Sequence, residues 1–117
     1  MMNVLGGIRA VGEQRLRTRD ENGVIITIDL YYFPAIQQWY ADINSGEFVL
    51  NHTRLTNNLN ILWSYARIID FGMAILVNDL GDPFLINDFS SERCQIGILT
   101  MAEVVQTQDL YDQLRES

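Results

Sequence analysis

Apolar and polar residues alternate along two stretches in the first half of the chain, 13–32 and 38–51. A period of two with many β-branched residues is typical of strands that are buried on one face. Asn22-Gly23 interrupts the first stretch and Ser45-Gly46 the second, and such pairs favour tight turns. Each stretch is therefore predicted to be a β-hairpin. The predicted buried faces carry Val24, Ile26, Ile28 and Leu30 in the first hairpin and Trp39, Ala41 and Ile43 in the second.

The second half of the chain is less regular. Apolar residues at helical spacing over 56–69, with Thr56, Asn57 or Asn58 as the cap, predict either a helix of one or two turns or a compact loop. The segment 71–78 is apolar on both faces, which predicts a central strand. The segment 93–105 alternates loosely and is predicted to be a last strand, with Cys94, Ile96, Ile98 and Thr100 on one face.

The two ends of the chain lack a strand pattern. Residues 1–12 contain Gly6, Gly7 and Gly12 and predict an irregular arm that becomes ordered only against a partner. Residues 106–117 place Leu110 and Leu114 at helical spacing and predict a short amphipathic helix or a docking tail. We therefore expect a single domain with an arm (1–12), a β domain (13–105) and a tail (106–117). Its predicted class is all-β and mainly antiparallel, a small barrel or sandwich of six to eight short strands with one short helix.

The charge of the chain narrows the choice of partner. Acidic residues outnumber lysine and arginine 15 to 8, for a net charge of −7, and lysine is absent. Such a surface repels a phosphate backbone, so we expect no nucleic-acid partner. Arginine is suited to fixed pairing with carboxylates at interfaces. Arg15, Arg17 and Arg19 share one face of the first predicted strand, and we expect this row to be solvated or to face an acidic protein.

Little in the sequence indicates catalysis or a membrane. Cys94 is the single cysteine and His52 the single histidine. Cys94 lies on an apolar strand face and is predicted to be a core residue, and His52 is predicted to lie in a surface loop. No Gly-rich phosphate loop or serine nucleophile motif occurs, so we expect neither an enzyme nor a cofactor. Residues 1–10 do not resemble a signal peptide and the apolar runs are short, so we expect an intracellular protein without a membrane partner.

An acidic turn region supports an alternative function. Asp79, Asp82 and Asp88 lie close together in the sequence, beside two asparagines. Carboxylate and amide oxygens are the ligands that Ca²⁺ prefers, although the spacing does not fit an EF-hand loop. Aspartate, asparagine and glycine are also common in ordinary turns. The alternative is therefore a metal- or small-ligand-binding β-barrel built on these three aspartates with His52.

Two tyrosines are predicted to point away from the core. Tyr31 and Tyr40 fall on the polar faces of their strands, and tyrosine is enriched in protein interfaces. They complete the set of candidate interface residues, which comprises Arg15, Arg17, Arg19, Tyr31, Tyr40, Leu110 and Leu114.

The order of strand and turn patterns over 30–104 resembles a known family. Tyr31-Tyr32-Phe33 ends one strand, and the tryptophan-bearing run from Gln38 to Ile43 follows after a short turn. Further along come Leu62 with Tyr65, then Phe71-Gly72, Asp82-Pro83, Asp88-Phe89 and the run from Arg93 to Val104. In this order the chain resembles the small baseplate plug proteins of contractile-tailed bacteriophages, of the cyanophage type.

The resemblance implies a structural virion protein that catalyses no reaction. Proteins of this family sit in the tail baseplate near the tail axis. The implied partners are the hub, the tube and neighbouring baseplate subunits, with several copies in each particle. The implied location is the virion, and the host cytoplasm during assembly.

Overall fold

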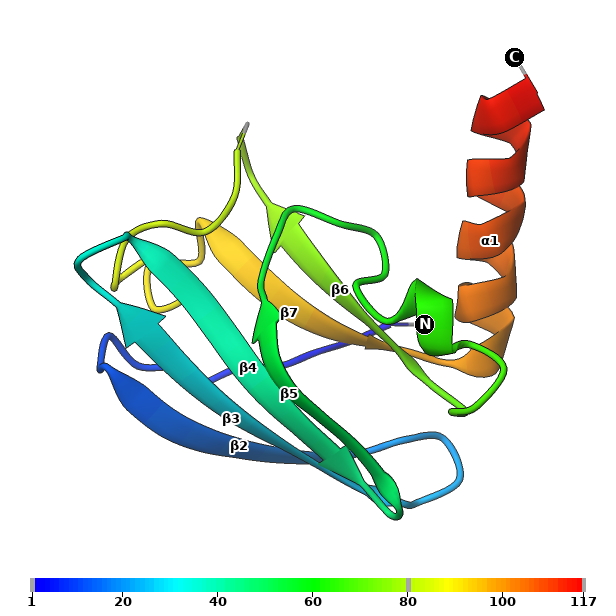
Figure 1. Cartoon of the computed structure of the whole chain (residues 1–117), viewed down its shortest axis with the longest axis horizontal. Coiled ribbons are helices and arrows are strands. Elements are labelled where there is room, and N and C mark those ends of the chain that lie inside the picture. Colours follow the sequence, from blue (N-terminus) through cyan, green and yellow to red (C-terminus); the bar gives the residue numbers. More distant parts are fainter. Residues whose placement is uncertain (1, 80, 117) are drawn as a thin grey trace.

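The computed structural model describes residues 2–79 and 81–116, which form two antiparallel β-sheets and one α-helix (Figure 1). The prediction of a mainly antiparallel β protein is confirmed. Both sheets are open and pack face to face, so the arrangement is a sandwich and not a closed barrel. In chain order the elements are β1 (Asn3–Val4), β2 (Glu13–Arg19), β3 (Ile25–Phe33), β4 (Gln38–Ser45), β5 (Phe48–Arg54), the 3₁₀ turn η1 (Trp63–Tyr65), β6 (Gly72–Val77), β7 (Cys94–Leu99) and α1 (Met101–Glu116).

The two predicted hairpins form the larger sheet, in the order β2-β3-β4-β5. The β2–β3 loop differs in detail from a two-residue Asn-Gly turn, because Arg19 pairs with Ile25 and only Gly23 has a positive φ, of 82°. The side chain of Asp20 supports this longer loop by accepting the backbone N–H groups of Asn22 and Val24. Val24 consequently precedes β3 and is exposed, contrary to the predicted buried face.

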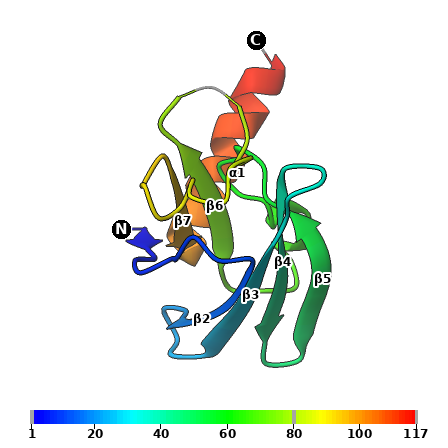
Figure 2. The same cartoon turned by 90° about the vertical axis from the view of Figure 1, so that its left-hand side faces the viewer.

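The smaller sheet has the order β1-β7-β6. The prediction that 71–78 forms a central strand is therefore wrong, since β6 lies at an edge. Its two apolar faces have a different explanation. Met73 and Ile75 point into the core between the sheets, whereas Ala74 packs with Leu99 of β7 and Val104 of α1 on the other side. The first turn of the helix thus packs against the outside of the smaller sheet (Figure 2).

The amino-terminal segment is only partly the irregular arm that the sequence predicts. Asn3 and Val4 form β1 and pair with Ile98 and Gly97 of β7. The Leu5 N–H group then donates to the carbonyl of Ile96 over 2.8 Å, which continues this pairing. Ile8 is buried in the core. The segment therefore has its binding partner within the same chain.

The last strand ends earlier, and the helix begins earlier, than the sequence pattern predicts. Strand β7 stops at Leu99, and α1 starts at Met101, so the predicted strand 93–105 and tail 106–117 divide at a different place. The cause is a capping box at the helix start. The Glu103 N–H group donates to Thr100 Oγ1, and Glu103 Oε1 accepts the Thr100 N–H group. This reciprocal pair satisfies two backbone donors that the first helical turn leaves without partners.

The segment between β5 and β6 is a compact loop with one 3₁₀ turn, and none of the predicted caps operates there. Its main role is to cover the free edge of β6. Asn58 forms an isolated antiparallel bridge with Ile75, and the Ile61 N–H group donates to the Met73 carbonyl. Between them, the buried Asn60 side chain accepts the N–H groups of Leu62 and Met73, each over 3.0 Å. The edge is thereby satisfied without another strand.

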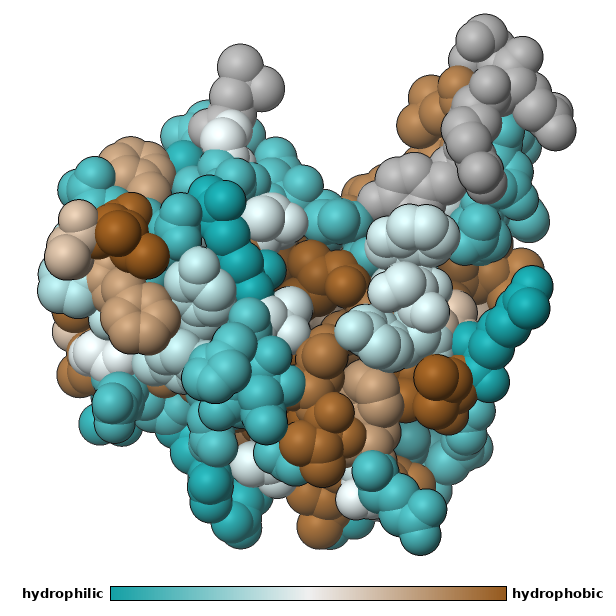
Figure 3. Space-filling view, viewed as in Figure 1, coloured by the Kyte–Doolittle hydropathy of each residue, from teal (hydrophilic) through white to brown (hydrophobic). Residues whose placement is uncertain are grey.

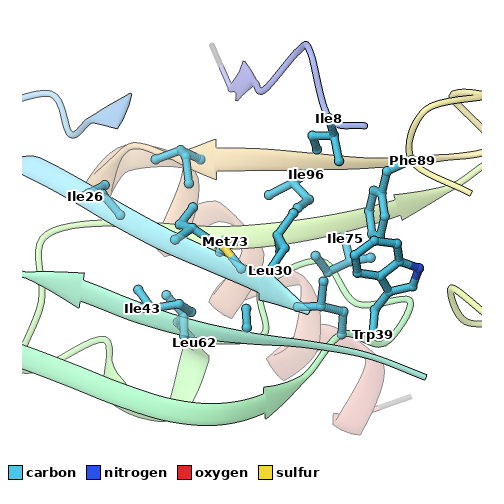
Figure 4. Packing of buried hydrophobic residues seen from close by; sticks show 14 of the residues in the cluster. Ile8, Ile26, Leu30, Trp39, Ile43, Leu62, Met73, Ile75, Phe89 and Ile96 are labelled. Atoms are coloured by element: carbon cyan, nitrogen blue, oxygen red, sulfur yellow. The ribbon is translucent and has the colours of Figure 1, made fainter. Parts of the chain in front are cut away.

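The core lies between the two sheets (Figure 4). Trp39, Ala41 and Ile43 are fully buried there, as the alternation predicts. One end of the sandwich is closed by the segment 83–93. Phe89 of this segment packs edge-on against Trp39, and the Trp39 Nε1–H group donates to the Leu85 carbonyl over 2.9 Å.

Candidate functional site

The face of the larger sheet that points away from the core gathers most of the predicted interface residues. Because side chains alternate along each strand, every second residue of β2, β3 and β4 points outward there. We call this surface the outer face. It carries Arg15, Arg17, Arg19, Asp29, Tyr31, Phe33, Tyr40, Asp42 and His52.

Three aromatic rings form a cluster on the outer face. Tyr31 and Tyr40 are directly opposite each other on β3 and β4, and their rings stack with centroids 6.1 Å apart. Phe33 packs edge-on against both rings, at 5.5 and 5.3 Å. We call Tyr31, Phe33 and Tyr40 the aromatic cluster. Its two tyrosines are half-buried, and Phe33 is exposed.

A bulge in β5 brings the only histidine to this cluster. Two residues of β5, Asn51 and His52, stand opposite the single residue Asp42 of β4. His52 has a φ of 59°, and its backbone N–H group donates to Asp42 Oδ1 over 2.8 Å. A bulge re-aims a side chain in this way, because the extra residue breaks the alternation along the strand. The His52 ring is thereby turned toward Tyr31.

The Tyr31 hydroxyl joins the histidine and the aspartate. It donates to Asp42 Oδ1 over 3.0 Å and lies 2.7 Å from His52 Nδ1. A phenol has one proton, so donation to Asp42 leaves His52 Nδ1–H to donate to the hydroxyl oxygen. Burial and the hydrogen bond to Asp42 raise the pKa of Tyr31 to about 12. The group therefore stays protonated and holds the ring in place, and it is a poor nucleophile.

The predicted arginine row does lie on one exposed face of β2, and two of its members are held by neighbouring groups. Arg15 forms a two-point ion pair with Asp29 across the β2–β3 ladder, at 2.7 and 3.1 Å. The hydrogen bond from Arg15 lowers the pKa of Asp29. Arg19 donates to the Gly23 carbonyl over 2.8 Å. Within the described residues Arg17 forms neither a hydrogen bond nor an ion pair, so its charge is available to a partner.

The structure separates the remaining two interface candidates from this group. Leu110 and Leu114 lie on α1, which packs on the smaller sheet and not on the larger one. The helix then runs beyond the sheets (Figure 1). Leu114 is 63% exposed and Leu110 is 43% exposed. The seven predicted interface residues thus belong to two surfaces on opposite sides of the molecule, the outer face and α1.

The three aspartates of the alternative function are each occupied by other groups. Asp88 is 1% exposed, accepts the N–H groups of Phe84 and Leu85, and pairs with Arg93 at 2.9 Å. Asp79 pairs with the same arginine, while Asp82 accepts the Asn57 N–H group. In the described part of the chain no three His, Cys, Asp or Glu residues are grouped to hold a metal ion.

The prediction that Cys94 is a core residue is confirmed, since the residue is 1% exposed. Burial, followed by the charge of Asp88, raises the pKa of its thiol to about 11. A thiolate is the reactive form of cysteine, so this environment disfavours nucleophilic chemistry.

Four residues of the outer face were not predicted as interface residues, namely Asp29, Phe33, Asp42 and His52. Phe33 shares the parity of Tyr31 along β3, so the period of two was sufficient to place it. Asp42 shares the parity of Tyr40 along β4, and its partners are Tyr31 of β3 and the backbone of His52 in the β5 bulge. Nothing in the sequence around His52 indicates that bulge, so the contact between His52 and Tyr31 could not be predicted.

No protein family matches this chain, and no similar curated protein is found. Among the described residues, no helix is long and apolar enough to span a membrane.

Proposed function

We propose that this chain is a non-enzymatic structural subunit that works by binding other proteins through the outer face of its larger sheet. The observation that carries the proposal is the aromatic cluster. Large rings on the outside of a sheet are costly to leave exposed, and aromatic residues are enriched in protein interfaces. Here the Tyr31 ring is fixed before any partner arrives, because its hydroxyl is held by both Asp42 and His52.

Rigidity of this kind favours binding. A side chain that is already ordered loses little conformational entropy when a partner covers it. The Arg15–Asp29 pair and the partly buried tyrosines present such an ordered surface. Arg17 adds a positive charge to it and suits a carboxylate on the partner.

The particular assembly that we propose is a contractile phage tail. This follows from the resemblance of 30–104 to the baseplate plug proteins, which implies hub, tube and neighbouring baseplate subunits as partners. The presence of exposed binding features on two opposite sides, the outer face and α1, suits a subunit that contacts more than one neighbour. On this proposal the protein resides in the virion, with several copies per particle.

The test is incorporation of variants into particles. Phe33→Ser and Arg17→Glu change exposed side chains of the outer face and should leave the fold intact. Glu92→Gln, at an exposed position outside the larger sheet, is the control. In a complementation assay with purified tails, the first two variants should be depleted from the baseplate while the control is incorporated. Normal incorporation of both Phe33→Ser and Arg17→Glu would exclude the outer face as the binding surface.

A further inference from the structure

A second exposed surface lies at the end of the sandwich opposite to Trp39 and Phe89. There the β2–β3 loop, the β4–β5 turn and the segment 68–71 lie near one another (lower right in Figure 1). Residues from all three segments line a cleft of about 540 Å³. We call it the end cleft. Its apolar walls include Val24, Val49 and Ile68, which are 43%, 57% and 73% exposed. Figure 3 shows the molecule from the same direction as Figure 1. Hydrophobic surface in its lower middle is bordered by hydrophilic side chains.

The charged residues of the end cleft all have one sign. Asp20, Glu47 and Asp70 line it, and no arginine does, although Arg19 and Arg67 are close in sequence. Asp20 is engaged by the backbone of its own loop. Glu47 and Asp70 are exposed and form neither a hydrogen bond nor an ion pair within the described residues. Unlike the arginine row, the end cleft therefore has no internal counter-charges.

We propose that the end cleft binds an extended segment of another protein, in which an apolar side chain is flanked by arginine or lysine. The apolar residue would cover Ile68 and Val24, and the basic residues would pair with Glu47 and Asp70. Charge complementarity of this kind selects the partner and speeds its association. An extended conformation suits the site, because β5 contributes Phe48 and Val49 to the cleft and ends the larger sheet. A segment laid along an edge strand points alternate side chains to one side.

This inference concerns a different surface from the outer face and does not rest on the proposed function. Either can fail without the other. The outer face suits an acidic partner through Arg17, whereas the end cleft would bind a basic partner.

The experiment titrates the full chain, with labelled isoleucine methyl groups, with a five-residue peptide in which arginine alternates with isoleucine. Two control peptides replace arginine by glutamate or isoleucine by serine. We expect the Ile68 methyl signal to shift with the first peptide at concentrations up to about a millimolar, the range of weak specific binding. Raising the salt from about 0.05 M to about 0.5 M should weaken binding, since exposed charges are screened.

Variants locate the binding site. Ile68→Ser should weaken binding about tenfold by removing apolar contact area, and Asp70→Asn should weaken it about threefold. The matched controls are Ile36→Ser, an exposed isoleucine in the β3–β4 turn at the other end of the sheet, and Glu92→Gln. Both controls should bind as the parent chain does, and thermal melts confirm that every variant is folded.

Several results would overturn the inference. These are the absence of shifts around the end cleft with the arginine–isoleucine peptide, equal binding of the glutamate peptide, or equal losses in Ile68→Ser and Ile36→Ser. Concentration-dependent shifts of the same signals without peptide would show that a second copy of this chain occupies the cleft instead.

Discussion

The side chain of Asn60 occupies the space directly beside Gly72, so that a Cβ atom on residue 72 would lie 2.8 Å from Asn60 Nδ2. Asn60 has little freedom to move away, because its Oδ1 atom holds the N–H groups of both Leu62 and Met73. The two residues together close the edge of β6.

Replacing Gly72 by alanine should therefore destabilise the protein by about 1–3 kcal/mol, the usual range for overpacking a tight site. Urea unfolding measures the loss. Gly12→Ala is the control, because its new Cβ would meet no atom within 4 Å. In an Asn60→Ala background the additional cost of Gly72→Ala should shrink, which a double-mutant cycle detects. Equal costs in both backgrounds would show that Asn60 is not the obstacle.

The two faces of β3 should respond very differently to truncation. Ile28 is fully buried between the sheets, so Ile28→Ala should cost about 2–5 kcal/mol through lost burial and the cavity left behind. Thr27 lies on the outer face, and Thr27→Ala should cost well under half as much. Comparable shifts of the urea midpoint for the two variants would contradict this assignment of the faces.

Asp88 should contribute far more to stability than Asp79, although both pair with Arg93. Removing the buried Asp88 carboxylate leaves the N–H groups of Phe84 and Leu85 without their acceptor, and Asp88→Ala should cost about 3–5 kcal/mol. Asp79→Ala removes an exposed partner and should cost about 1 kcal/mol or less.

The Asp88→Ala variant also tests the metal-binding alternative. A ligand that binds only the native state raises its stability. If excess calcium raised the urea midpoint of the parent chain but not that of Asp88→Ala, the alternative function would gain support. We expect no such difference.

Stability should fall at high pH through Tyr31. Its pKa is raised to about 12 in the folded protein from an ordinary value of 10.0. The contribution of Tyr31 to the free energy of unfolding is therefore complete below pH 10. It is lost as the pH rises through the folded pKa, because the unfolded chain releases this proton at a lower pH than the folded chain does. Tyr31→Phe should show a shallower loss of stability between about pH 10 and pH 12. Identical pH profiles of the parent and the variant would refute the assigned role.

Cys94 should react slowly with alkylating reagents in the native protein. The thiol is buried, and its pKa of about 11 leaves little thiolate at neutral pH. Because it is the only cysteine, one added label per chain gives an unambiguous signal in the mass of the protein. Labelling should become much faster in denaturant. Similar rates with and without denaturant would mean that the thiol is accessible in the fold.

The parts of the fold that could be predicted are those specified by nearby residues. The alternation around Ile28 and Trp39, and the turns at Gly23 and Gly46, are local patterns, and both hairpins form as expected. The helix start is also specified locally, since Thr100 and Glu103 stand at capping-box spacing.

The parts that could not be predicted depend on residues distant in the chain. The polar Asn60 is buried because it meets the edge of β6, and the amino-terminal segment is ordered because it meets β7. The outer face shows the same limit. Tyr31 was correctly placed on it, but the partners that fix its ring come from the β5 bulge.

The pairing of β1 with β7 has a consequence for synthesis. Asn3 leaves the ribosome well before its partner Ile98 is synthesised, because the two residues lie far apart in the chain. The four-stranded sheet can form from neighbouring hairpins, but the three-stranded sheet must wait until both β6 and β7 have been made. Contacts so far apart in sequence slow folding. During that wait the core faces of β3 and β4 are uncovered, so the nascent chain passes through a period in which chaperone binding would protect it from aggregation.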